Sequence, residues 1–395
     1  MALIQRLALL SMMLMFFVVP MDGISIFAAL PVVKFAGLLA FGFVAVLIMS
    51  GTVIRGTSWF IVLSMLYISW ILLSFLWTSM PVDYQHPQAI NSQQSVKAHL
   101  YLLGVVVLLF QIVRTEADLQ WLLLAFLLGS FGLLALFLQS YDPGVTTVRH
   151  GLKERDANEM SVQLALALPV ALYLLSMSKF WWIRILSAVY LPLAIVSIFA
   201  TGSRTGFVVL LIGLLGVLPL LLRSGVLIKL MSAVALCVAV IVAINTIPEK
   251  TFERILSTGS ALTEGTLNER SITWQKAWVE WNQSPVFGHG LGSFRRMVNK
   301  YNVDYTAHNS FISISVEQGL VGLALYLMVI SLSLYYAWQL DKRRRIILMS
   351  MVLVAVTGQM TLTLHEAMYI WLAYALAATA MSLHYLRPSL KETVS

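Results

Sequence analysis

Long apolar stretches follow one another along nearly the whole chain, and they constrain the fold more than any single motif. About twelve windows of about 18 to 22 mostly apolar residues are long enough to cross a bilayer as helices. With 59% hydrophobic residues, 11% charged residues and a mean hydropathy of +0.85, the chain is too apolar for a soluble globular protein. Because irregular backbone cannot face lipid, we expect an all-α polytopic membrane bundle. The predicted spans lie near 5–20, 32–50, 57–77, 97–114, 118–140, 158–178, 181–200, 205–223, 226–247, 309–338, 345–364 and 366–386.

We expect residues 1–395 to form a single membrane domain, without internal repeats or a separate soluble domain. The first apolar segment, Leu7 to Val19, follows Arg6 and has the composition of a signal peptide. Later spans and the lack of a clear small-residue cleavage site favour a retained helix. Cys237 is the only cysteine and lies in an apolar run, so we expect a small buried side chain without an internal disulfide.

Basic residues predict the orientation of the spans. In the short connections, Lys and Arg favour the side that would hold both termini, and Lys342 to Arg345 form the densest run there. We therefore expect both termini and this run in the cytoplasm, with the run acting as a topology anchor. The large loop, residues 248–306, would then lie on the extracytoplasmic side.

The predicted extracytoplasmic face carries more positive charge than orientation requires. Its basic residues near helix ends or in the large loop include Lys97, Arg149, Lys153, Arg155, Arg204, Arg254, Arg270, Arg295 and Arg296. Guanidinium groups make paired, charge-assisted hydrogen bonds to phosphate, so this set predicts a phosphate-rich ligand. Helices expected to begin near Asn158, Thr205 and His308 would add backbone donors and positive dipole ends. Attraction to anionic membrane lipids is the alternative interpretation.

The segment Thr201 to Gly206 connects two predicted spans on this face. Its glycines, Gly202 and Gly206, allow close approach to the backbone, and Ser203 or Thr205 can cap the following helix. These features predict a cradle for a diphosphate, with Ser203 and Arg204 as binding residues. A tight turn with a snorkelling arginine remains the alternative.

The large loop is too long to be a simple connection. Arg270, Trp274, Trp278 and Trp281 recur at helical spacing, whereas Glu280 falls off this face, and the indole rings predict an interfacial helix. The glycine-rich stretch Phe287 to Phe294 follows no strand, so it is not a dinucleotide fingerprint. We expect a flexible turn within a lid, in which His289 either touches a ligand or lies in water.

His308 and Asn309 precede an apolar helix, where a membrane protein rarely places polar groups without need. An imidazole with an ordinary pKa near about 6.5 can take a proton from an attacking hydroxyl at neutral pH. His308 is therefore the predicted general base. Asn309 would orient the imidazole or, as we favour, cap the helix. Glu317 would lie inside the span, either paired with polar neighbours or orienting the site.

These residues resemble a known family. His308 and Asn309, then nine residues, then Gly319, two residues and Gly322 resemble the signature of bacterial O-antigen ligases. Those enzymes share a superfamily with O-antigen polymerases and protein O-oligosaccharyltransferases. The span pattern, the large loop and the pair Ser203-Arg204 extend the resemblance over the chain, although only the histidine motif is specific.

The resemblance implies a GT-C-like glycosyltransferase of the bacterial inner membrane with a periplasmic active site. In such ligases a glycan on undecaprenyl diphosphate moves, with inversion, to a sugar hydroxyl of lipid A-core, completing lipopolysaccharide. At matching positions, Arg204 and Arg270 would bind the donor diphosphate and His308 would act in catalysis. Arg149 and Arg155 are further candidates from the charge pattern. The implied partners are this donor, this acceptor and membrane lipids, and no nucleic acid.

Neither a cofactor nor a metal is expected. The acidic residues of the predicted outer segments are scattered among basic neighbours, and His365-Glu366 lacks a second metal ligand at helical spacing, so a helix-end hydrogen bond is its expected role. His86, His99, His150 and His384 carry no clear signal. Two alternatives remain open: a polymerase or related transferase using the same donor, and a secondary transporter, which would normally show repeated halves.

Overall fold

The computed structural model describes residues 2–24, 31–51, 58–78, 92–142, 144, 149–216, 219, 225–256, 270–301, 303 and 306–392. The regular secondary structure of these residues is helical, and one isolated bridge pairs Leu152 with Arg155. The elements are α1 (Ala2–Val18), the 3-10 helix η1 (Val19–Met21), α3 (Val32–Met49), α4 (Trp59–Ser74), α5 (Ser92–Ile112), α6 (Glu116–Ser140), α7 (Ala157–Met177), α8 (Trp181–Ala200), α9 (Arg204–Leu215), α11 (Val226–Thr246), α12 (Glu249–Leu256), α14 (Arg270–Trp281), α15 (Phe294–Asn299), α16 (Ser310–Gln339), α17 (Lys342–Thr361) and α18 (Met368–Glu392).

The all-helical prediction is confirmed for the described residues, and the protein is a polytopic helical membrane protein. Within this part of the chain, 8 helices are long and apolar enough to cross a membrane. The shorter apolar helices are Trp59–Ser74, Arg204–Leu215, Cys237–Thr246 and Met368–His384. The total of about twelve spans stays a prediction. Part of the predicted span 205–223 lies outside the described residues.

The core of the bundle is built around α7, which is apolar on all sides and buried along nearly its whole length. Small residues let its neighbours approach closely, as in other membrane bundles. A Cβ on Gly206 of α9 would lie 2.6 Å from Ser161 Cβ, and one on Gly358 of α17 would lie 2.7 Å from Val162 Cγ1. The first turns of α7 therefore pack against the start of α9 and the end of α17.

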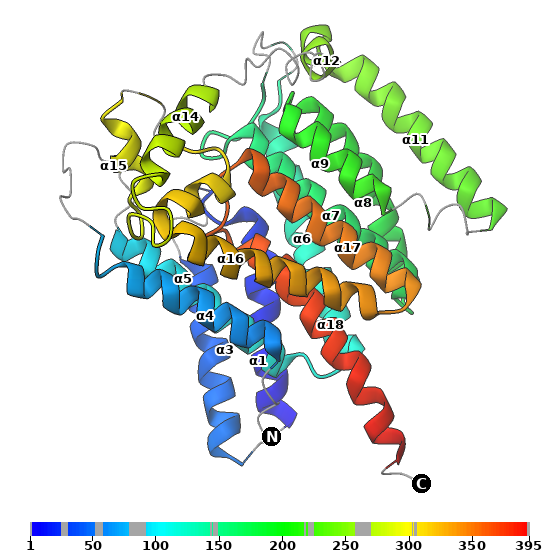
Figure 1. Ribbon diagram of the computed structural model, residues 1–395. Coiled ribbons are helices and arrows are strands. Elements are labelled where there is room, and N and C mark those ends of the chain that lie inside the picture. The colour runs from blue at the N-terminus through cyan, green and yellow to red at the C-terminus, as the bar shows by residue number, and fades with distance from the viewer. Residues whose placement is uncertain are drawn as a thin grey trace.

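The bundle has two distinct ends. The start of α1 and the end of α18 lie at the bottom of Figure 1, whereas α12, α14 and α15 lie at the top. We call the top the loop end. A small apolar cluster of Ala277, Phe294, Val298, Ala307 and Val316 packs α14 and α15 against the start of α16. The helices of the large loop are thus fixed onto the bundle exactly where the His308 motif begins.

The opposite end holds the basic run. Helix α17 begins at Lys342 rather than near Arg345, because Asp341 caps it by accepting bonds from Arg343 N (3.2 Å) and Arg344 N (3.3 Å). The run is more than an anchor, since buried Arg344 pairs with Glu116 of α6 at 2.8 Å. This pair joins α17 to α6.

The expectation that Cys237 is buried was wrong, and the burial of Glu280 was not predicted. Cys237 is exposed, because α11 lies at the edge of the bundle and packs mainly on α8. Glu280 is fully buried on α14, where its carboxylate pairs with Lys300 Nζ at 2.8 Å and accepts a hydrogen bond from the Tyr301 hydroxyl. Trp278, by contrast, is 61% exposed. The buried face of α14 is therefore offset from the tryptophan stripe.

Candidate functional site

The start of α9 is a tight capped turn. Gly202 has a φ of +63°, which favours glycine, and directs the chain from α8 into α9. Ser203 then caps α9, because its Oγ accepts from Gly206 N at 2.8 Å. The same hydroxyl donates to Asn158 Oδ1 at 2.7 Å. Ser203 and Asn158 are both buried, so the first turns of α9 and α7 are held together at the loop end.

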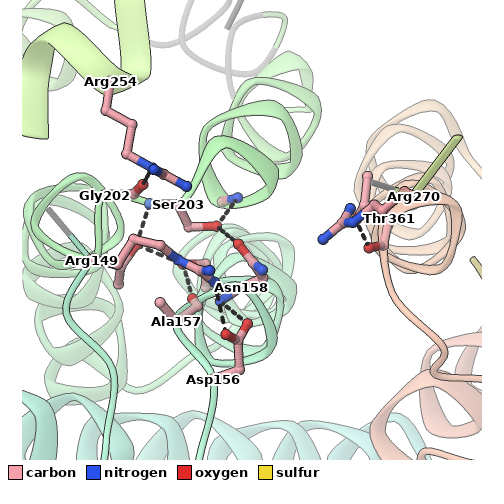
Figure 2. Close-up of polar contacts among 12 residues, drawn as sticks. Arg149, Asp156, Ala157, Asn158, Gly202, Ser203, Arg254, Arg270 and Thr361 are labelled. Carbon is pink, nitrogen blue, oxygen red and sulfur yellow. Dashed lines mark hydrogen bonds and ion pairs between the residues drawn. The ribbon is translucent and has the colours of Figure 1, made fainter. Parts of the chain in front are cut away.

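Three arginines surround this turn, and Figure 2 shows Arg149 and Arg254 on either side of Gly202. Arg254 Nε donates to Gly202 O at 3.2 Å, and Arg204 Nε donates to Arg254 O at 3.3 Å. Arg149 Nη2 pairs with Asp156 Oδ2 at 2.7 Å. We call Arg149, Arg204 and Arg254 the arginine cluster.

The arginine cluster is electrostatically crowded. Burial, and then the neighbouring charges of Arg149 and Arg204, lower the pKa of Arg254 from its ordinary value. Asp156 is the acidic partner seen at Arg149. The positive ends of α7 and α9 add to the field at the same place. Binding an anion here would relieve the repulsion among the three guanidinium groups.

A second group gathers around the carboxyl end of α17, whose last carbonyls lack partners within their own helix. Arg270 Nη1 donates to Thr361 O at 3.2 Å, and Asn309 Nδ2 donates to Met360 O at 3.1 Å. Trp274, one turn after Arg270, donates from Nε1 to Ala307 O at 2.7 Å. Arg270 and Asn309 are therefore fixed to the same helix end, and Trp274 holds the residue before His308.

His308 itself has an unusual backbone. Its φ of 47° is the only positive value among the non-glycine residues that the structure describes. Such a conformation costs free energy and occurs more often where function demands it. Asn309 follows as the cap of α16, because its Oδ1 accepts from Phe311 N (2.9 Å) and Ile312 N (3.2 Å). The half-buried imidazole thus projects from a defined position beside the helix start.

The two groups lie at one level of the bundle. Gly358 of α17 packs against Val162 of α7. Thr361 is about one turn beyond Gly358, and Asn158 is about one turn beyond Val162, both toward the loop end. Figure 2 shows the Arg270 guanidinium on the side facing the Arg149 and Ser203 group. Both groups therefore lie at the loop end of the same packed helices.

Arg155 lies apart from this arrangement. Its guanidinium is buried and donates to Pro20 O at 2.7 Å, to Asp22 O and to Gln163 Oε1. Its neighbour Glu159 lies 3.7 Å from Nε. These contacts tie η1 to α7, so the structure gives Arg155 protein partners rather than bringing it together with the arginine cluster.

The glycine-rich stretch is held by the bundle. Helix α16 is interrupted at Gly319, whose φ of +62° and ψ of −165° are not helical. The freed backbone groups bond to the loop: His289 N donates to Val316 O at 2.9 Å, and Leu320 N donates to Pro285 O at 2.8 Å. Glu317 accepts from Gly292 N and Phe294 N. The expected free turn is therefore an anchored segment.

Several other candidates lie elsewhere. His289 is half-buried and its Nε2 lies 2.8 Å from Glu280 O, within the packing of α14. Among the described residues, no group of three His, Cys, Asp or Glu side chains could hold a metal ion.

Arg254 was only one of several loop arginines in the sequence. Arg254 lies close to Arg149 and Arg204 because α12 packs back against the start of α9. The spacing of these residues along the chain does not predict that contact.

Comparison with known proteins agrees with this geometry. Residues 189–327 match the family model described as O-antigen ligase, and no curated protein matches the chain. The matched region begins within α8 and ends within α16, so it contains Ser203, Arg204, Arg254, Arg270 and His308. Over these residues the chain is similar to O-antigen ligases, which supports an assignment to the O-antigen ligase and polymerase superfamily.

Proposed function

We propose that the protein is an O-antigen ligase that transfers a glycan from undecaprenyl diphosphate to a sugar hydroxyl of lipid A-core. The transfer inverts the anomeric carbon and takes place at the periplasmic face of the bacterial inner membrane. One observation carries the proposal: the arginine cluster and the His308–Arg270 group occupy one end of the bundle on packed helices. This arrangement suits a diphosphate beside an attacking hydroxyl.

The arginines supply the charge stabilisation that the leaving group needs. As the glycosidic bond breaks, negative charge grows on the diphosphate oxygen, and fixed guanidinium groups stabilise that charge more in the transition state than in the ground state. Arg204 and Arg254 bind the diphosphate at the start of α9, with Arg149 beside them. Arg270 approaches from α14. Arg155 takes no direct part in this scheme, because its guanidinium is bonded to protein oxygens.

His308 takes the proton from the acceptor hydroxyl as that oxygen attacks the anomeric carbon. Asn309 and the end of α17 fix the backbone from which the imidazole projects. Arginine fills the charge-neutralising role that a divalent metal has in other transferases. Activity should therefore persist in EDTA, and a loss that a divalent ion restores would contradict this part of the scheme.

The test is glycan transfer by purified, full-length protein in nanodiscs, with a lipid-linked donor and lipid A-core acceptor. His308→Ala should reduce kcat by about 100-fold or more, because general-base catalysis is lost. Arg204→Ala should reduce kcat/KM by about 100-fold, because a fixed charge near the leaving group is lost.

His384→Ala and Arg6→Ala are the matched controls, since both residues are exposed and lie toward the other end of the bundle. Their activity should equal that of the wild type. Full activity of His308→Ala would contradict the general-base role, and unchanged kinetics of Arg204→Ala would leave that arginine outside the donor site.

A polymerase is the second candidate, because the family match supports ligase-type and polymerase-type activity alike. It would take another lipid-linked glycan as acceptor, as a protein O-oligosaccharyltransferase would take a protein. Offering each acceptor in the same assay distinguishes the three. Substrate flux across vesicles without glycan transfer would instead favour a transporter.

A further inference from the structure

We propose that His99, His365 and Glu366 form a binding site for hydroxyl groups of the acceptor sugar, separate from the arginine cluster. We call these three residues the paired-imidazole cluster. The identity of the sugar as part of the acceptor rests on the proposed function, whereas the affinity for hydroxyl groups rests on the cluster itself.

The three side chains come from two parts of the chain and meet near the loop end. His99 is on α5, and its ring centroid lies 6.4 Å from that of His365, in the turn between α17 and α18. His99 Nδ1 lies 3.9 Å from Glu366 Oε1. Both imidazoles are buried, whereas the Glu366 side chain is 28% exposed. The carboxylate therefore lies at the accessible edge of the cluster.

Each imidazole has one ring nitrogen without a protein partner. His99 Nδ1 lies 2.8 Å from Ser95 O, and since a carbonyl only accepts, Nδ1 carries the proton. In the neutral ring Nε2 is then an acceptor, and it is buried without a hydrogen bond. His365 Nδ1 is also buried and without a partner. Buried polar atoms are nearly always hydrogen-bonded, so two unpartnered nitrogens on rings whose centroids lie 6.4 Å apart point to a ligand with hydroxyl groups.

The paired-imidazole cluster differs from the proposed donor site in its charge. Burial lowers the pKa of His365 to about 4, so its imidazole is neutral near pH 7 and offers one donor and one acceptor. Glu366 adds a negative charge, which disfavours a phosphate. A neutral hydroxyl can donate to His99 Nε2 or to the carboxylate and can accept from a ring N–H. The side chains in the described chain do not converge as metal ligands either.

The position of the cluster links it to His308. Ser310, two residues after His308, donates from Oγ to Leu362 O at 3.0 Å and accepts from Leu364 N at 2.8 Å. The chain then continues directly into His365. The arginine cluster is on the α7 and α9 side of the end of α17, whereas α5 packs against α4 and α18. A sugar held on the α5 side would thus present its hydroxyl to His308 from the side away from the arginine cluster.

The test measures donor and acceptor kinetics separately on full-length protein in nanodiscs. Glu366→Gln and His99→Gln should raise the acceptor KM by about tenfold or more and change the donor KM by less than about twofold, because only acceptor hydrogen bonds are lost. His384→Gln is the control. Equal rises in both KM values, or a fall in kcat with both unchanged, would overturn the binding site.

A binding measurement without turnover keeps this inference distinct from the proposed function. The wild-type protein should retain lipid A-core in preference to lipid A that lacks the core sugars, and Glu366→Gln should lose that preference. A preserved preference in a variant that still melts like the wild type would overturn the inference. If the wild type binds lipid A-core selectively but transfers no glycan, the proposed function fails and the hydroxyl site stands.

Discussion

At the scale of single residues, His308 and Asn309 divide two tasks. His308 adopts a φ of 47°, a region in which His and Asn are the commoner non-glycine residues. Asn309 supplies the cap of α16 with its carbonyl oxygen and bonds to the end of α17 with its amide nitrogen. An asparagine can do both because it carries an acceptor and a donor. The pair therefore fixes the position of the imidazole and joins α16 to α17.

Substitutions at Asn309 should separate these two bonds. Asn309→Ala loses both and should lower the free energy of unfolding by about 1–2 kcal/mol, whereas Asn309→Asp keeps the cap and should lose less. Melting temperatures in detergent rank the stability of the two variants and the wild type. The rate of glycan transfer reports whether the His308 imidazole keeps its position. Equal melting temperatures for Asn309→Ala and the wild type would contradict the capping role.

At the scale of elements, the break in α16 explains the glycine pair that follows His308. At Gly319 the helical hydrogen bonds stop, and the segment from Pro285 to Phe294 supplies replacement partners. Trp70 of α4 also donates to Gln318 O at 3.1 Å. Gly322 lies against the Trp70 ring, where a Cβ would be 3.2 Å from Cδ1. The break thus fixes the large loop to α16 about three turns from His308.

Gly319→Ala tests this element. The substitution forces an L side chain into a positive φ and would place its Cβ against Val286 O. The conformation alone should cost about 1–3 kcal/mol, and activity should fall because the loop that carries Arg270 shifts. Gly104→Ala is the matched control, since nothing lies within 4 Å of its Cβ position in α5. A normal melting temperature and normal transfer by Gly319→Ala would contradict this account.

At the scale of the whole molecule, charge is divided between the two ends of the bundle. The run Lys342 to Arg345 lies at the end where α1 begins, whereas the arginine cluster and Arg270 lie at the loop end. The first kind of charge lies in a short connection, which the orientation rule counts, whereas Arg254 and Arg270 lie in the large loop, which the rule counts only weakly. We therefore relate the charge at the loop end to a ligand rather than to orientation.

Cysteine labelling tests which end faces the periplasm. In a Cys237→Ser background, Lys250→Cys at the loop end should react with a membrane-impermeant maleimide in intact spheroplasts. Lys342→Cys at the other end should react only after lysis. Both positions are exposed, so burial does not explain a difference between them. The reverse pattern would place the arginine cluster in the cytoplasm and would contradict the proposed function.

How much of the site could be predicted depends on the range of the interactions involved. The cap of α9, the cap of α16 by Asn309 and the helix that carries Arg270 follow from neighbours within a few residues. The sequence predicted the last two and named Ser203 as one of two candidates for the first. Glu280 was missed because its partners, Lys300 and Tyr301, lie about twenty positions away and only packing of α15 on α14 brings them close. For the same reason, Arg254 was named only as one of many basic residues on this face, and His99 carried no clear signal.

The amino-acid sequence by itself determined that the chain crosses a membrane as helices and that one histidine motif stands at a helix start. Hydrophobic length and capping are local properties, so they can be read along the chain. Only the tertiary structure decided which guanidinium groups share a site. Arg149, Arg204 and Arg254 meet because α12 returns to the turn before α9, whereas Arg155 turns inward to η1. Side-chain direction depends on helix packing, which residue spacing does not encode.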